Sequence, residues 1–141
     1  MGAVMQGRPL IPGDAQGELL VSDEPLSFWG GYDQHSGEII DRRHPLSGKI
    51  AAGRVLAVPF TRGSSTTTAV VLESVRAGTA PAAILTASPD PFLALASVVA
   101  DEMYGLPIPV VVLDAPDYAK LRTGCRVEVH RDGTVVVLDS L

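Results

Sequence analysis

Residues 62–68, RGSSTTT, place an arginine, a glycine and five hydroxyl side chains in one row. The apolar run at 55–60 precedes this row and apolar residues at helical spacing follow it, so we expect the row where a strand passes into a helix. At such a junction the free backbone N–H groups and the positive end of the helix dipole point into the loop. Position and residue types together predict a loop that binds an anion.

The residues of this serine loop, 62–66, offer different groups to an anion. Arg62 can donate two parallel hydrogen bonds to a carboxylate or a phosphate, and Gly63 lets the anion approach the backbone. Ser64, Ser65 and Thr66 add hydroxyl groups of little bulk. The alternative is an ordinary helix N-cap with an arginine in solvent, and the residue types alone leave it open.

Two common catalytic motifs do not fit the loop. A Walker loop would end in Lys followed by Ser or Thr, and a hydrolase nucleophile would lie in Gly-x-Ser-x-Gly. A Ser-His-Asp arrangement would need His35, His44 or His130 to reach the serines through the fold, and nothing in the spacing requires it. We expect His44 to order the loop before Pro45 and His130 to face solvent on a strand.

Aromatic residues flank a Gly-Gly pair in the N-terminal third. Phe28, Trp29 and Tyr32 lie where the backbone must turn tightly or approach another surface. These residues either form part of the core beneath a loop or contribute to an interface with a partner. Nearby, Asp33 and Asp41 offer carboxylates to a cleft, whereas a carboxylate in a turn more often only meets solvent.

Composition limits the classes of function. The net charge is −5 and no run of Lys or Arg exceeds two residues, which argues against a nucleic-acid partner. A single cysteine, Cys125, and three scattered histidines give no metal-ligand spacing, so we expect no metal on this chain. The sequence has no signal-peptide pattern and no membrane-spanning apolar run, so we expect a cytoplasmic protein without a membrane partner.

Charged residues make up only 19% of the 141 residues and apolar residues 46%. An independent domain usually carries more charge. The excess of apolar side chains fits a permanent partner subunit, and it fits a small β-rich domain with a large core equally well.

Hydrophobic periodicity predicts the elements that hold the loop. We expect strands at 18–21, 53–58 and 82–86, another in the run IPVVVLD, and a hairpin in CRVEVHRDGTVVVL. One helix begins at Thr66 and ends before Gly78, with a buried face of Val70, Val71, Ser74 and Val75. A second helix ends at Gly105, with Phe92, Leu95, Ala96 and Val99 at helical spacing.

The order of these elements predicts the fold class. Strands alternate with helices after residue 53, which favours an α/β fold with a largely parallel central sheet and right-handed crossovers. A glycine-rich β portion from the N-terminal third would lie next to this sheet. No linker or repeat interrupts the chain, so we expect one domain over 1–141.

Several long stretches, taken in order, carry a resemblance to a known family. LSFWGGYDQHSGEIIDRRHPLSG, GRVLAVPFTRGSSTT, GTAPAAIL and YGLPIPVVV resemble the small subunit of the aconitase X group of hydro-lyases, over residues 4–138. The resemblance implies a swivelling β/β/α domain, as in the mobile domain of aconitase. It also implies a heterodimer or higher assembly with a large subunit that carries an iron–sulfur cluster.

The resemblance also implies an activity and a site. Members of the group look like dehydratases of small hydroxy acids, and we expect cis-3-hydroxy-L-proline, giving pyrroline-2-carboxylate, ahead of mevalonate 5-phosphate. The catalytic serine of the family corresponds to Ser65, with Ser64 as the next candidate. Arg62 would hold the carboxylate or phosphate of the substrate, with Gly63 and Thr66 beside it. The competing hypothesis is a non-catalytic regulatory subunit whose loop only binds a small anion.

Overall fold

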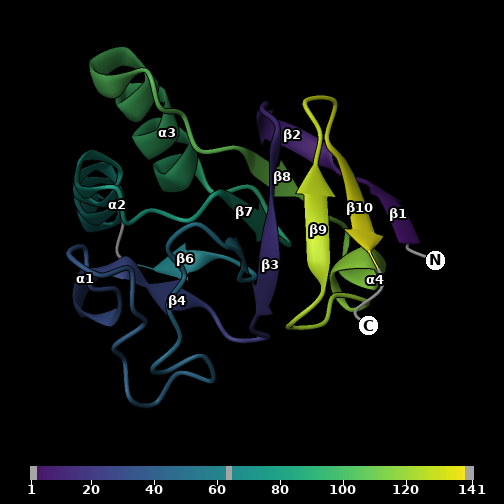
Figure 1. Cartoon of the computed structure of the whole chain (residues 1–141), viewed down its shortest axis with the longest axis horizontal. Helices are drawn as coiled ribbons and strands as arrows, with labels where there is room; N and C mark the ends of the chain where they lie inside the picture. The colour runs from purple at the N-terminus through teal and green to yellow at the C-terminus, as the bar shows by residue number, and fades with distance from the viewer. Residues whose placement is uncertain (1–2, 63–64, 139–141) are drawn as a thin grey trace.

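The computed structural model describes residues 3–62 and 65–138 of the chain. Eight strands are β1 (Ala3–Gln6), β2 (Arg8–Ile11), β3 (Ala15–Val21), β5 (Val55–Ala57), β7 (Ala83–Thr86), β8 (Val110–Val112), β9 (Arg126–Val129) and β10 (Thr134–Leu138). They form one sheet in the order β1-β10-β9-β3-β5-β7-β8-β2 (Figure 1). A separate two-stranded parallel sheet pairs β4 (Leu26–Ser27) with β6 (Thr61–Arg62). The helices are α1 (Phe28–Gly31), α2 (Ser65–Ala77), α3 (Pro91–Tyr104) and α4 (Ala115–Tyr118).

Strand β3 divides the large sheet into two layers. Its residues 15–18 pair antiparallel with β9, and its residues 19–21 pair parallel with β5. β3, β5, β7 and β8 are parallel neighbours, with antiparallel β2 at their edge. β1 and β2 are joined through Gly7 yet stand at opposite ends of the strand order, so the sheet curls until its two edges meet.

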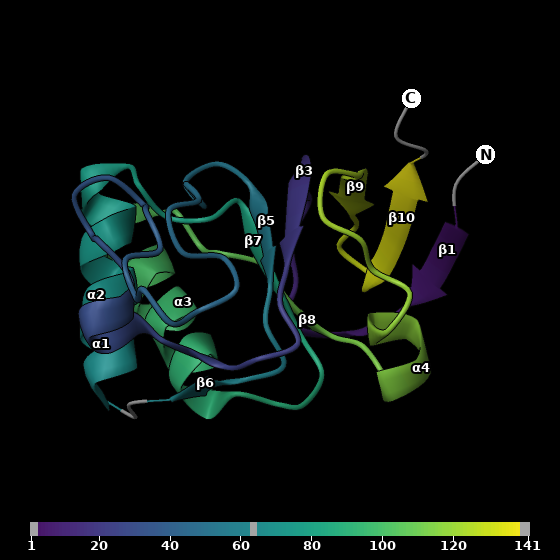
Figure 2. The same cartoon turned by 90° about the horizontal axis from the view of Figure 1, so that it is seen from below.

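Side chains on the parallel strands alternate between two cores. In β5, Val55 and Ala57 pack with residues of β9 and β10, whereas Leu56, and Val58 just after the strand, pack with residues of α2 and α3. Figure 2 shows the resulting layers, with α2 and α3 on one side of the parallel strands and β9, β10 and β1 on the other. Because both faces are buried, the strands read as continuous apolar runs. The predicted α/β class with a largely parallel central sheet is confirmed, in a β/β/α arrangement.

The buried face of α2 is the one that the sequence predicts. Val70, Val71, Ser74 and Val75 are all buried. The helix ends before Gly78, whose φ of +76° is the left-handed conformation that favours glycine at a helix end.

Of the four residues predicted at helical spacing on α3, only Ala96 is buried. The helix buries Leu93, Ala96, Ser97 and Ala100, while Phe92 is 38% and Leu95 is 51% exposed. Apolar residues surround most of this helix, so periodicity could not select one face. The fold selects the face with the smaller side chains, because α3 packs closely against α2.

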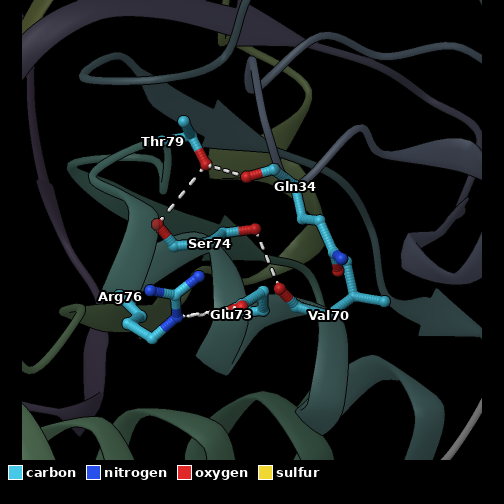
Figure 3. Close-up of polar contacts among 6 residues, drawn as sticks. All are labelled: Gln34, Val70, Glu73, Ser74, Arg76 and Thr79. Atoms are coloured by element: carbon cyan, nitrogen blue, oxygen red, sulfur yellow. Dashed lines mark hydrogen bonds and ion pairs between the residues drawn. The ribbon is translucent and has the colours of Figure 1, made fainter.

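A polar network fastens the segment after α1 to the end of α2. The Thr79 hydroxyl donates to the carbonyl oxygen of Gln34 at 2.6 Å and lies 3.4 Å from that of Ser74 (Figure 3). The Tyr32 hydroxyl donates to the carbonyl oxygen of Thr79 at 2.8 Å. These bonds span more than forty residues of sequence and hold the irregular 32–50 region in place.

The structure separates the three aromatic residues beside the Gly-Gly pair. Phe28 and Tyr32 are buried, with ring centroids 4.9 Å apart, and belong to the core on the helix side of the sheet. Trp29 is 67% exposed, since it lies in a turn where Gly30 has a φ of +78°. Phe28 and Tyr32 therefore follow the core alternative, and of the three only Trp29 is accessible to a partner.

Candidate active site

The serine loop lies at the carboxyl end of the parallel strand β5. From β5 the chain passes through Pro59 and Phe60 into β6, and α2 begins at Ser65. The predicted junction of strand and helix is therefore confirmed, with the short strand β6 added. Gly63 and Ser64 lie outside the described residues. In open α/β sheets, ligands bind beyond the carboxyl ends of the strands, and this loop has that position.

The described side chains of the loop reach solvent. Arg62, Ser65 and Thr66 are all exposed. Ser65 is the first residue of a 13-residue helix, so its hydroxyl lies at the positive end of the helix dipole. One short loop thus carries an exposed guanidinium at Arg62 and an exposed hydroxyl at Ser65, and this pair of groups suits an anionic ligand.

A hydrogen bond from a buried threonine connects α2 to the residue at the start of the loop. Thr67, with no exposed surface, donates its hydroxyl to the carbonyl oxygen of Arg62 at 2.9 Å. On the other side, Arg62 pairs with Ser27 in the parallel β4–β6 ladder. The backbone of Arg62 is therefore held from α2 and from β4 at once.

The side chain of Asp90 also bonds to β6, at Thr61. This carboxylate is 4% exposed, and one of its oxygens accepts from the backbone N–H of Thr61 at 2.9 Å and from the Thr61 hydroxyl. The other oxygen accepts from the backbone N–H groups of Phe92 and Leu93 and so caps α3. Sequence reasoning missed Asp90, although an Asp before a Pro at a helix start is a recognisable N-cap pattern.

The histidines have structural contacts away from the loop. His44 is buried, and its Nδ1 accepts from the backbone N–H of Leu46 at 3.1 Å, which confirms its predicted role in ordering that loop. His130 is exposed, as predicted, and its Nε2 lies 3.4 Å from the carboxylate of Glu128.

The two candidate cleft carboxylates stabilise turns. Asp33 accepts from the backbone N–H of His35, and this bond lowers the pKa of the Asp33 carboxyl. Asp41 accepts from the backbone N–H of Arg43 in the same manner. The solvated-turn interpretation of both residues is therefore the correct one.

The described part of the chain has no evident metal site. Within residues 3–62 and 65–138, no three His, Cys, Asp or Glu side chains come together as ligands for an ion. Cys125 is a free thiol. These residues do not fit an iron–sulfur cluster, which needs several thiolates. Over the same residues, no helix has the length and apolar character to cross a bilayer.

The fold and the loop together define a class, namely a β/β/α domain with a serine-rich loop at the carboxyl end of its parallel strands. The sequence model of the aconitase X swivel domain matches residues 4–138. The chain belongs to this family.

Relatives of known name are dehydratases or their subunits. The chain is 48% identical over 132 residues to a cis-3-hydroxy-L-proline dehydratase of Pseudomonas aeruginosa, covering 89% of this chain and 23% of that protein. It is 36% identical over 136 residues to the phosphomevalonate dehydratase small subunit of Thermococcus gammatolerans, covering 96% and 98%. The chain thus spans less than a quarter of the first relative and nearly all of the second.

A solved structure has the same fold. The aconitase X of Thermococcus kodakaraensis, in its holo-form, superimposes with a TM-score of 0.86 at 34% identity, covering 98% of this chain and all of that one. This agreement extends the likeness from sequence to backbone geometry over nearly the whole chain.

Proposed function

We propose that the chain, as a single swivelling domain, is the small subunit of an aconitase X-type hydro-lyase. It supplies the serine loop, and a large subunit supplies the rest of the pocket. The observation that carries the proposal is the exposed Ser65 at the positive end of α2, three residues after the exposed Arg62, on a backbone that buried side chains hold in place. We place this enzyme in the cytoplasm.

Dehydration of a 3-hydroxy acid requires a base and an anion clamp. The proton on the carbon next to the carboxylate leaves, its electron pair forms the C2=C3 double bond, and the hydroxyl on C3 departs. Ser65 is the proposed base, and Arg62 holds the carboxylate that fixes C2 beside it. A serine accepts this proton only when its own proton loss is assisted, and the N-terminus of α2 and the Arg62 guanidinium provide positive charge for that purpose.

The iron–sulfur cluster of the proposed enzyme belongs to the large subunit. One cysteine in the entire sequence cannot ligate such a cluster. The partner's cluster would act as a Lewis acid on the leaving hydroxyl. The domain described here contributes binding, orientation and proton transfer.

We propose cis-3-hydroxy-L-proline as the substrate and pyrroline-2-carboxylate as the product. Identity is higher to the P. aeruginosa dehydratase of this imino acid, at 48%, than to the T. gammatolerans phosphomevalonate dehydratase small subunit, at 36%. A loop with a single arginine, in a chain of net negative charge, also suits a carboxylate better than a more highly charged phosphate.

Mevalonate 5-phosphate is the second candidate. The observation in its favour is the coverage of 98% of the T. gammatolerans phosphomevalonate dehydratase small subunit, because that relative is itself a separate chain of this size. In this case Arg62 would clamp a phosphate or carboxylate of the longer acid.

Co-expression with the large subunit of the same organism tests the proposal. The purified assembly is incubated with each acid, and product formation is followed by proton NMR. We expect turnover of cis-3-hydroxy-L-proline by the assembly and none by either subunit alone. Turnover of the phosphorylated acid instead would select the second candidate, and a large subunit fully active without this chain would support the regulatory hypothesis.

A further inference from the structure

Asp90 bonds to Thr61, the residue immediately before the serine loop, although it lies 25 residues beyond Ser65 in the sequence. Its carboxylate is 4% exposed and accepts four hydrogen bonds, two from Thr61 and two from the start of α3. A helix N-cap needs only one side-chain oxygen. The second oxygen therefore serves Thr61, the residue immediately before Arg62.

We propose that Asp90 is a positioning residue of the active site, which fixes β6 and through it the places of Arg62 and Ser65. The inference rests on the proposed dehydratase function of the loop. Asp90 itself has no proposed contact with substrate.

The contacts around β6 explain why this one carboxylate matters. The β4–β6 ladder pairs Thr61 with Leu26 and Arg62 with Ser27, and Thr67 holds the carbonyl oxygen of Arg62. The strand is only two residues long, and the backbone N–H of Thr61 donates to Asp90, so Asp90 connects β6 to the start of α3. The Thr68 hydroxyl, on α2, donates to the carbonyl oxygen of Phe92 and so connects α2 to the same end of α3.

Asp90 thereby connects β6 to the N-terminus of α3. Because Thr68 connects α2 to the same end of α3, a shift of β6 relative to α3 would move Arg62 relative to Ser65 at the start of α2. Displacement of a reacting group by about 1 Å can lower a rate about a hundredfold. A loosely held β6 would therefore reduce turnover without removing any group that touches substrate.

The substitution Asp90→Ser separates the two roles of this carboxylate. Serine is a good N-cap, so its single oxygen keeps α3 capped, but it offers no second oxygen to Thr61. The matched control is Asp114→Ser, because Asp114 caps α4 through the backbone N–H of Asp117 and, within the described residues, has no hydrogen bond to β6. Thr61→Val, which removes only the hydroxyl, should have a smaller effect of the same kind.

Amide hydrogen exchange measures the hydrogen bond between Asp90 and Thr61 independently of enzyme activity. In Asp90→Ser we expect the Thr61 amide to exchange about tenfold faster or more, while the amides of Phe92 and Leu93 stay protected. Unchanged exchange at Thr61 would overturn the proposal whatever the enzyme does. Asp114→Ser should leave all three amides unchanged.

Steady-state kinetics of the assembly with the large subunit, per folded enzyme, then test the consequence. We expect Asp90→Ser to lower kcat about tenfold to a hundredfold and Asp114→Ser to keep the wild-type value. Faster Thr61 exchange with a normal kcat would overturn the positioning role and leave the dehydratase function standing. If the wild-type assembly turns over neither acid, the proposed function fails and the catalytic role of Asp90 fails with it, whereas the exchange data still decide whether Asp90 holds β6.

Discussion

Arg62 and Ser65 have to be exposed and fixed at the same time, and different neighbours satisfy the two demands. Their side chains face solvent, while the buried Thr67 hydroxyl holds the carbonyl oxygen of Arg62 and the buried Asp90 carboxylate holds the N–H of Thr61. Both buried groups have protein partners, so the backbone at Thr61 and Arg62 is held before a substrate arrives. Such preorganisation is what electrostatic stabilisation of a developing charge requires.

The residue types of the loop were predictable from sequence, but its supports were not. An arginine, a glycine and hydroxyl residues between an apolar run and a helical pattern are visible in any linear reading. The hydrogen bond from Thr61 to Asp90 joins residues 29 apart, and only the packing of α3 beside α2 creates it. The sequence contains the N-cap pattern of Asp90, but it does not indicate that Asp90 also bonds to Thr61.

Substitution Arg62→Ala should weaken substrate binding. The guanidinium is proposed to hold the same carboxylate in the ground state and in the transition state, so its loss should raise KM about tenfold to a hundredfold and change kcat little. Kinetics of the assembled enzyme measure both constants. Arg131→Ala, which removes another exposed arginine in the β9–β10 turn, is the control and should leave KM unchanged. A lower kcat at an unchanged KM for Arg62→Ala would argue against a clamp.

At the scale of elements, the strands that are buried on both faces were the predictable ones. β3, β5, β7 and β8 have long apolar runs because each contributes to both cores, and the sequence places all four. The edge strands β1 and β2 were missed, since Gly7 and Pro9 interrupt their pattern. β4 and β6 have two residues each, and pairs this short exist only through tertiary contact.

The link between α3 and the segment before β8 gives a prediction of stability. The Ser97 hydroxyl donates to the carbonyl oxygen of Ile108 at 2.7 Å and accepts from its backbone N–H at 2.8 Å, in a buried position. Ser97→Ala would leave both backbone groups without a partner and should lower the free energy of unfolding by about 2 kcal/mol. Ser36→Ala, which removes an exposed hydroxyl, should cost less than about 0.5 kcal/mol in the same urea titration. Equal losses in the two variants would contradict the buried bond.

Tyr32 helps to attach the segment after α1 to the end of α2. We therefore expect the free energy of unfolding to fall at alkaline pH. Burial raises the pKa of the Tyr32 phenol, whose hydroxyl donates to Thr79. Because the folded-state pKa lies above the unfolded-state value of about 10, this contribution is complete below pH 10 and is lost as pH rises toward the folded-state value.

Urea unfolding of wild type and Tyr32→Phe between pH 8 and pH 11 measures this effect. Above pH 10 the wild-type free energy of unfolding should fall more steeply, by at most about 1.4 kcal/mol per pH unit. Burial also raises the pKa of Tyr118, but that residue is present in both proteins and its effect cancels. Parallel curves for the two proteins would show that Tyr32 does not titrate with unfolding.

For the whole molecule, the exposed apolar side chains fit the proposed assembly. Trp29 is 67% exposed, and Leu95 and Met103 on α3 are 51% and 59% exposed. The low charged fraction pointed to a partner or to a large core, and the structure has two cores together with these uncovered side chains. We expect a stable heterodimer whose interface includes Trp29, which sedimentation of wild type and Trp29→Ser with the large subunit would measure. Unchanged association of the variant would place the interface elsewhere.

The central claim is that this chain contributes Ser65 as the base of an assembled dehydratase. The most direct measurement is kcat of the Ser65→Ala assembly, with the melting temperature of the same sample and with Ser36→Ala and Ser64→Ala beside it. We expect a loss of about a hundredfold to ten-thousandfold in kcat with an unchanged melting temperature, because an exposed hydroxyl adds little to the core. A near-normal kcat for Ser65→Ala with an inactive Ser64→Ala would move the base by one residue. Near-normal turnover in both variants, or a loss of about 1 kcal/mol in stability with unchanged kcat, would contradict the catalytic role and leave the loop as a helix cap.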